Sequence, residues 1–287
     1  MPTIPYDPTK AALLTPGVRE TVFLDASYRR AGLDAICAEC ARLAYVDFDV
    51  VPGTGMRRLT DALALIGYAA PTALIDTDKK TGTEAFATVT ADGRALVSFR
   101  GTQPDQLRDL LTDGKAFLVP WSVGGQVHEG FSNAFDSISA KLADALRQAT
   151  SPLPPIFTGH SLGAALATLA ASAYKGATLV TFGSPRVGDS AFIATLDATT
   201  IHRYVDCNDF VTKLAPAFPG FYTHCNGDPL YIDRTGVIQT EATARDKGVD
   251  QLVANLAYAW KYAFRCRNVL ARTAADHAPI NYIRAFT

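Results

Sequence analysis

Residues 157–165, Phe-Thr-Gly-His-Ser-Leu-Gly-Ala-Ala, decide how the rest of the chain is interpreted. The segment 155–159 predicts a strand, and the alanine-rich segment 161–175 predicts a helix. Ser161 therefore lies on a sharp strand-to-helix turn, which would present its hydroxyl at the carboxyl end of the strands. A reactive serine is the favoured interpretation. A glycine-rich turn with an incidental serine is the alternative.

The segments around this turn predict one α/β domain over residues 1–287. Tight turns separate three extended segments, which predicts an antiparallel meander. Strands and helices then alternate, which predicts a mixed, mostly parallel sheet with helices on both faces. The expected strands are 72–78, 83–92, 94–101, 155–159, 177–183, 201–206 and 229–233. The expected helices are 29–46, 131–146, 161–175, 188–197 and 249–274.

The amino-acid composition and the charge balance argue against several classes of function. The 287 residues are 48% hydrophobic and 19% charged, which supports a sizeable core. Acidic and basic residues number 28 and 27, so the basic surface of a nucleic-acid binder is not expected. The N-terminus lacks the pattern of a secretory signal, and no apolar stretch is long enough to span a bilayer.

The cysteines show no spacing typical of a zinc site, so a zinc centre is not expected from them. Reduced or buried thiols are the simpler interpretation, and they favour a cytoplasmic location over a secreted one. The five cysteines are Cys37, Cys40, Cys207, Cys225 and Cys266.

A nucleophilic serine needs a base and an acid that orients the base. In α/β-hydrolases the three follow the chain order serine, acid, histidine. Among the five histidines, that order leaves His224 and His277 as candidate bases. For the acid, Asp209 lies in the loop beyond the strand 201–206 and is favoured over Asp206, which closes that strand.

The oxyanion of an ester reaction needs two backbone N–H donors. Leu162, directly after the serine, would supply one, and Thr102 in the turn VSFRGTQ (97–103) would supply the other. Gly159 and Gly163 would let the strand and the helix approach closely at the turn. His160 adjoins the serine, so its side chain leaves the turn in another direction and we expect a structural role.

Five ordered motifs make the chain resemble the class 3, or fungal-type, lipases of the α/β-hydrolase superfamily. They are SFRGT, VHEGF, GHSLGAALATLAA, TFGSPRVGD and NDFVTKLAP, and the resemblance covers mainly residues 83–233 and the DH pair near the end. It implies a Ser161–Asp209–His277 triad, Thr102 in the oxyanion hole and a structural role for His224. It also implies hydrolysis of lipid or other acyl esters without a metal or cofactor.

The same resemblance implies a short helical lid at about 103–120. Leu107, Leu110 and Leu111 would share one face of this helix and could turn towards lipid. A surface helix packed on the body is the alternative. The segment 103–113 is charged and has no aromatic residue, so we predict weak interfacial activation.

The helix expected at 249–274 combines apolar positions with a basic end. We expect it to pack on the core, with its final cations favouring the helix dipole. Contact with a membrane surface is the alternative. The apolar positions are Leu252, Val253, Leu256, Trp260, Phe264, Val269 and Leu270, and the basic residues are Lys261, Arg265, Arg267 and Arg272.

Together these features predict a carboxylic-ester hydrolase, most simply a triacylglycerol lipase that meets its acylglycerol substrate at a lipid–water interface. A phospholipase A1 and a feruloyl-type or short-chain esterase are alternatives on the same scaffold. An acyltransferase would use an alcohol in place of water. A non-catalytic binding module would need a broken triad, whereas every part is present in this sequence.

Overall fold

The sheet begins with the antiparallel meander that the sequence predicts. The computed structural model describes residues 4–48, 54–78, 80–101, 117–215, 221–225 and 227–286. Strand β2 lies between β1 and β3 and pairs antiparallel with both, with Phe86 opposite Ala73 and Ser98. The three strands are β1 (Thr72–Ile75), β2 (Glu84–Val89) and β3 (Ala95–Phe99).

The sheet continues from β3 through four parallel strands. The order across all eight strands is β1-β2-β3-β6-β7-β8-β9-β10. Beyond the parallel strands, β10 forms the far edge and pairs antiparallel with β9. These strands are β6 (Ile156–His160), β7 (Thr178–Phe182), β8 (Thr200–Asp206), β9 (Leu230–Ile232) and β10 (Ile238–Gln239). The carboxyl ends of β6 and β8 therefore meet at one edge, where α/β proteins place their functional groups.

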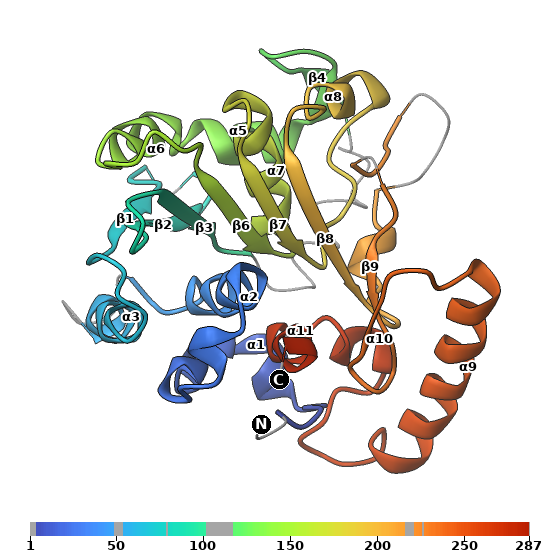
Figure 1. The fold of residues 1–287 in the computed structure, drawn as a ribbon. Coiled ribbons are helices and arrows are strands. Elements are labelled where there is room, and N and C mark those ends of the chain that lie inside the picture. Colours follow the sequence, from blue (N-terminus) through green and yellow to red (C-terminus); the bar gives the residue numbers. More distant parts are fainter. Residues whose placement is uncertain are drawn as a thin grey trace.

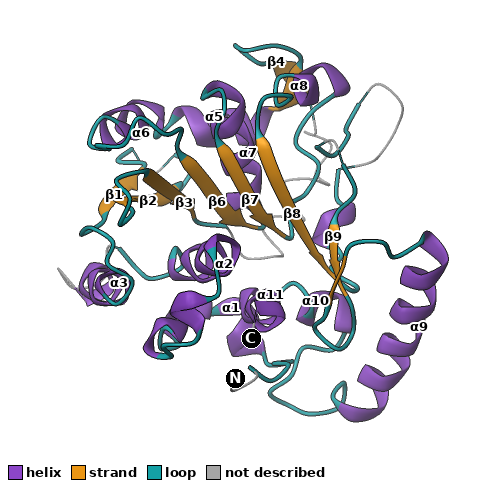
Figure 2. Cartoon of the chain, viewed as in Figure 1, coloured by secondary structure: helices purple, strands orange, loops and turns teal. Residues whose placement is uncertain are grey.

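Helices cover both faces of the sheet, as Figures 1 and 2 show. Helices α5 (Glu129–Asp136), α6 (Ser139–Leu146) and α7 (Leu162–Ala173) bury one apolar core against it. Helices α2 (Leu33–Leu43), α3 (Thr54–Ala64) and α11 (Pro279–Ile283) bury a second core on the opposite face. Strands covered on both faces are buried along their whole length, and all five residues of β3 and of β6 are buried, including the polar Ser98, Thr158 and His160.

The remaining elements are short, with the exception of one helix of 18 residues, α9 (Ala244–Lys261). A small separate sheet is formed by β4 (Leu118–Pro120) and β5 (Gln126–His128). The other helices are α1 (Lys10–Leu14), α8 (Ser190–Ala194) and α10 (Arg272–Ala275). The 3-10 turns are Pro16–Val18, Val22–Leu24, Tyr28–Arg30, Val211–Lys213 and Arg284–Phe286. None of the helices described here has the length and apolarity needed to cross a bilayer.

Two predicted helices are divided in the structure. The segment 131–146 forms α5 and α6, which separate where Ile138 takes φ −123° and ψ 0°. There the Ser137 hydroxyl donates to the Ala134 carbonyl oxygen at 2.7 Å. This gives one carbonyl group at the end of α5 a hydrogen-bond partner. The apolar stripe runs across this break, so periodicity alone could not reveal it.

The helix expected at 249–274 is also wrong in its limits and its packing. Helix α9 begins at Ala244, after a capping box between Thr243 and Asp246, and ends at Lys261. The expected apolar positions do not pack on the core: six of the seven are exposed, and only Val269 is buried. The side of α9 that meets the body instead carries Asp250, Ala254 and Tyr258.

Candidate active site

Ser161 occupies a strained turn between β6 and α7. Its φ of 60° and ψ of −127° lie outside the conformations that L-residues prefer, and among described non-glycine residues only Ala215 shares a positive φ. Such a conformation costs about 1–3 kcal/mol and persists where the surrounding structure imposes it. The backbone N–H of Ser161 donates to the Phe182 carbonyl oxygen at 3.0 Å, which ties the turn to β7.

The glycines of the turn are required by close packing. A Cβ on Gly159 would lie 2.3 Å from the carbonyl carbon of Gly163. A Cβ on Gly163 would lie 2.1 Å from the Phe99 carbonyl oxygen on β3. No side chain fits at either distance, so strand β6 and helix α7 can meet at this angle only with glycine at both positions.

The structure brings Ser161, His277 and Asp209 together from three elements. His277 lies between α10 and α11, and Asp209 lies in the loop after β8. His277 Nε2 is 2.9 Å from Ser161 Oγ, and its Nδ1 is 2.8 Å from Asp209 Oδ2. An ionised carboxylate can only accept, so Nδ1 carries the ring proton and Nε2 is free to accept the serine proton.

The Asp209 carboxylate accepts hydrogen bonds from two further donors. Its Oδ1 accepts from the Val211 backbone N–H at 2.8 Å, and its Oδ2 accepts from the Tyr282 hydroxyl. Asp209 is 1% exposed and His277 is 1% exposed, so these hydrogen bonds act where water does not compete for them. The arrangement fixes both the orientation and the tautomer of His277.

His160 joins the serine turn to the loop of His277. Its Nε2 is 2.7 Å from the His277 carbonyl oxygen, and its Nδ1 is 2.8 Å from the Tyr45 hydroxyl. Because a carbonyl can only accept, Nε2 carries the proton and Tyr45 donates to Nδ1. Burial, with a smaller contribution from His277, holds the pKa of His160 well below its usual value, so the ring stays neutral. The structural role expected for His160 is consistent with these contacts.

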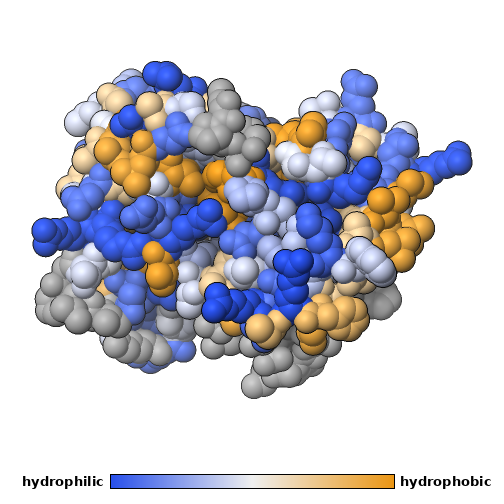
Figure 3. All heavy atoms as spheres, turned by 90° about the horizontal axis from the view of Figure 1, so that it is seen from below, coloured by the Kyte–Doolittle hydropathy of each residue, from blue (hydrophilic) through white to orange (hydrophobic). Residues whose placement is uncertain are grey.

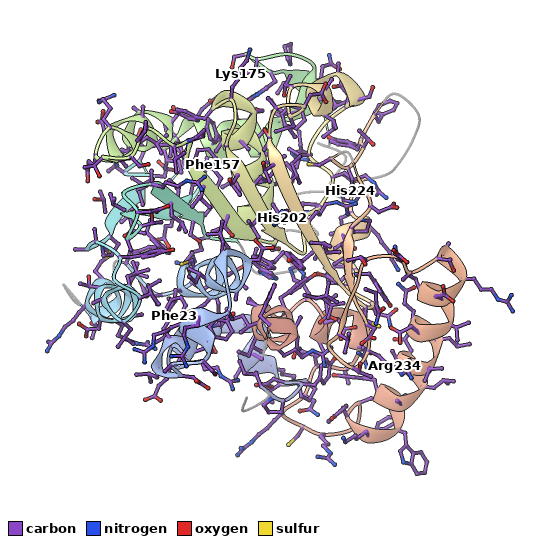
Figure 4. The ribbon with its side chains drawn as sticks, in the orientation of Figure 1. Phe23, Phe157, Lys175, His202, His224 and Arg234 are labelled. Carbon is purple, nitrogen blue, oxygen red and sulfur yellow. The ribbon has the colours of Figure 1, made fainter. Side chains whose placement is uncertain are left out.

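The other candidate base, His224, and the other candidate acid, Asp206, lie outside this hydrogen-bonded series. His224 Nε2 donates to the Thr212 carbonyl oxygen at 2.8 Å, and burial, followed by Arg203, lowers the pKa of His224 to about 3. Figure 4 shows His224 in the loop before β9 and His202 on β8. Asp206 is fully buried, with Oδ1 3.6 Å from the Arg284 guanidinium. Burial, followed by Asp276, raises the pKa of the Asp206 carboxyl well above its usual value.

Two glycines inside motifs quoted above leave room for the site in a way that the sequence did not reveal, although Gly101 was expected to allow a sharp backbone turn. Gly183 follows β7 with φ 63°, and a Cβ there would lie 2.6 Å from Asp209 Oδ2 and 3.1 Å from His277 Nδ1. A Cβ on Gly101 would lie 2.2 Å from the Tyr45 hydroxyl and 3.1 Å from Ser161 Cβ. The glycine in the motif TFGSP was visible, but only the folded chain reveals what it must leave room for.

One of the two expected oxyanion donors can be described. Leu162 is the first residue of α7, so its backbone N–H has no acceptor within the helix and lies at the positive end of the helix dipole. Thr102 and the lid residues Leu107, Leu110 and Leu111 lie outside the described residues. In the described part of the chain, no group of three or more His, Cys, Asp or Glu side chains is placed to hold a metal ion.

The sheet order, the strained serine after β6 and the order serine, aspartate, histidine define an α/β-hydrolase, as the sequence predicted. The crystal structure of Lip2 lipase from Yarrowia lipolytica shares the fold. It is 21% identical, and the match covers 76% of this chain and 88% of that one with a TM-score of 0.59.

Residues 96–218 match the family model described as lipase (class 3). Phospholipase A(1) DAD1 of Arabidopsis thaliana is 36% identical over 147 residues, which are 42% of this chain and 33% of that protein. Secreted mono- and diacylglycerol lipase 1 of Fusarium solani is 31% identical over 189 residues, which are 62% of this chain and 55% of that protein. The chain thus spans a third to about half of the length of these relatives.

Proposed function

We propose that this chain is a carboxylic-ester hydrolase of the lipase type, with Ser161 as nucleophile, His277 as base and Asp209 as the orienting acid. The observation that carries the proposal is the continuous hydrogen-bonded series from Ser161 Oγ through the His277 ring to Asp209 Oδ2, built on a serine with φ 60°. This is the arrangement that activates a weak hydroxyl nucleophile.

The reaction would proceed in two stages. Ser161 Oγ attacks the ester carbonyl carbon while His277 Nε2 takes the serine proton, and Asp209 stabilises the imidazolium that forms. The Leu162 N–H, with Thr102 as the second donor, would bind the oxyanion, and each donor would lower the activation barrier by about 3 kcal/mol. His277 then gives its proton to the departing alcohol. In the second stage His277 activates a water molecule, which releases the fatty acid and restores Ser161.

Acylglycerols are the substrates that we propose first. Support comes from the Fusarium relative, whose name specifies mono- and diacylglycerols. The second candidate is a phospholipid, supported by the Arabidopsis relative with the higher identity of 36%. Both are esters of long acyl chains, and the same serine chemistry would cleave either.

The compartment stays a prediction. All five cysteines are free, which supports a reducing compartment such as the cytoplasm. The Fusarium relative is named as secreted, which weighs against that location.

Hydrolysis of a chain-length series tests the proposal. Acetyl to palmitoyl esters, triolein emulsion and phosphatidylcholine would be given to the wild type and to Ser161→Ala. We expect Ser161-dependent cleavage that extends to long chains and to triolein. Cleavage confined to short or aromatic esters would contradict the lipase assignment. Equal rates for wild type and Ser161→Ala on every substrate would contradict the hydrolase mechanism itself.

A further inference from the structure

Helix α9 turns an apolar stripe towards solvent. Asp250, Ala254 and Tyr258 lie at intervals of four on one side of the helix and are buried against the body. The opposite side, half a turn away, carries five exposed apolar side chains at the spacing of a continuous helical stripe. They are Val249, Leu252, Val253, Leu256 and Trp260, which together we call the α9 stripe.

The exposure of this surface is unusually complete. Trp260 is 93% exposed, and Phe264, in the turn directly after the helix, is 94% exposed. Single apolar residues on a surface are normal, whereas a contiguous apolar group marks a contact site. In Figure 1 α9 stands at the margin of the molecule, and Figure 3 shows hydrophobic residues reaching the surface along that margin.

Charge next to the stripe indicates the kind of partner. Residues 251–275 contain no Asp or Glu, and the exposed basic residues Lys261, Arg265 and Arg267 follow the stripe. An apolar stripe with a tryptophan and a basic end is the composition of helices that lie in the headgroup region of a membrane. A second copy that packed its α9 parallel to this one would bring the basic ends together, and this disfavours a parallel dimer.

The inner side of α9 contacts the loop that carries Asp209. The Gln251 side chain donates from Nε2 to the Cys207 carbonyl oxygen at 2.8 Å. The Asn208 side chain donates from Nδ2 to the Gln251 carbonyl oxygen at 3.1 Å. Asn208 adjoins Asp209, so one helix contacts the loop of the candidate site with one side and leaves an apolar surface on the other.

We propose that α9 is an interfacial helix, which inserts the α9 stripe and Phe264 into the surface of a phospholipid bilayer with anionic headgroups. Lys261, Arg265 and Arg267 contact the headgroup phosphates at the boundary. This surface is distinct from residues 103–120, and its binding to lipid requires no turnover. The inference rests on the proposed function only in that a lipid ester gives the enzyme a reason to bind such a surface.

Vesicle binding tests the proposal in a Ser161→Ala background, in which turnover does not alter the vesicles. The test variant replaces Leu252, Leu256 and Trp260 with Gln. The control variant replaces Val18, Leu24 and Leu153, which are exposed apolar residues elsewhere, with Gln. On phosphatidylcholine vesicles with about 30% phosphatidylglycerol, we expect the test variant to bind about tenfold or more weakly, while the control binds like its parent.

Two further measurements separate insertion from simple electrostatic attraction. Lys261→Gln with Arg265→Gln and Arg267→Gln should weaken binding to anionic vesicles and reduce its dependence on salt. The chain has two tryptophans, and Trp121 is buried with its Nε1–H donating to Ser172 Oγ at 2.9 Å. A shift of tryptophan emission to shorter wavelength on adding vesicles would therefore report Trp260, and Trp260→Phe should abolish it.

The outcomes are distinct from those of the ester series. Equal binding by the test variant and its parent, or no emission shift with bound vesicles, would overturn the proposal. The wild type could instead fail to bind vesicles and form a dimer that the same three Gln substitutions dissociate. That result would overturn the proposal and assign the stripe to contact with a second copy of the chain. All α9 variants should retain wild-type turnover of a dissolved short-chain ester when Ser161 is intact. Loss of Ser161-dependent hydrolysis would contradict the proposed function and leave the binding result unaffected.

Discussion

The Tyr282 hydroxyl donates to Asp209 Oδ2, the same oxygen that lies 2.8 Å from His277 Nδ1. Tyr282 also accepts the Asp206 backbone N–H at 3.2 Å. Burial, with Asp209 as the next cause, raises the pKa of Tyr282 well above its usual value, so the phenol keeps its proton. One side chain of α11 thus orients the carboxylate that orients the candidate base.

Replacing Tyr282 with Phe should lower kcat by about tenfold, because one charge-assisted hydrogen bond of about 1.5–3 kcal/mol is lost from Asp209. KM for a dissolved ester should change little, since Tyr282 acts on the triad through Asp209. Steady-state kinetics and thermal unfolding measured together check this. An unchanged kcat in a folded Tyr282→Phe protein would mean that the Val211 N–H and His277 suffice to hold the carboxylate.

His277→Ala and His224→Ala should differ sharply in turnover. The first removes the group 2.9 Å from Ser161 Oγ and should lower kcat by about 10⁴-fold or more. The second removes a hydrogen bond to the Thr212 carbonyl oxygen and should leave kcat within about tenfold of wild type, with a stability loss of about 1 kcal/mol. A larger loss of kcat in His224→Ala than in His277→Ala would contradict the assignment of the base.

Gly183→Ala should damage the candidate site directly. Its new Cβ would lie 2.6 Å from Asp209 Oδ2, so the carboxylate or the imidazole must move, and we expect kcat to fall by about 100-fold. Gly82→Ala is the matched control, because Gly82 has the same φ of 63° and has no atom within 4 Å of its ideal Cβ. Both variants should lose about 1 kcal/mol of stability, but only Gly183→Ala should lose turnover. Equal kcat in the two would show that the site tolerates the displacement.

The sequence was sufficient for the parts of the site that local pattern and chain order specify. Gly159 and Gly163 around Ser161 identify a strand-to-helix turn, and the order of acid and histidine reduces the candidate bases to two. Gly183 and Tyr282 could not be found this way. Their importance comes from distances to Asp209, and these exist only after β7, β8 and α11 have packed together.

Helix α9 shows which feature of the packing could not be predicted from the sequence. The spacing of Leu252, Leu256 and Trp260 puts them on one side of a helix, but spacing does not tell which side faces the body. The buried side is held by a carboxylate, as Asp250 accepts from the Tyr231 hydroxyl at 2.8 Å and from the Arg234 side chain at 2.5 Å. A prediction from hydrophobicity alone would always place the apolar side of a helix against the body.

Stability should fall as the pH drops below neutrality, because His128 is buried as a neutral ring. Burial lowers its pKa from 6.5 to about 4. Between these values the unfolded chain binds a proton that the folded chain does not, so the free energy of unfolding decreases as pH falls, by about 1.4 kcal/mol per pH unit for this group. His160 and His224, whose pKa values are also lowered, add to the same trend.

His128→Asn isolates this contribution. His128 Nδ1 accepts from the Gly130 N–H at 3.0 Å as the N-cap of α5, and the Asn side chain can accept the same hydrogen bond without titrating. Urea unfolding at about pH 7 and about pH 5 should give a smaller stability loss in His128→Asn than in wild type, by about 2 kcal/mol. Parallel losses in the two proteins would show that His128 does not titrate on unfolding.

The most direct test of the central claim is the stoichiometry and location of fluorophosphonate labelling. The hydrogen-bonded arrangement of Ser161, His277 and Asp209 predicts one adduct per chain, located on Ser161 by peptide mass. Ser161→Ala should carry no adduct, and His277→Ala should react more slowly by orders of magnitude. An adduct on another residue, or equal labelling of wild type and Ser161→Ala, would contradict the assignment of Ser161 as the nucleophile.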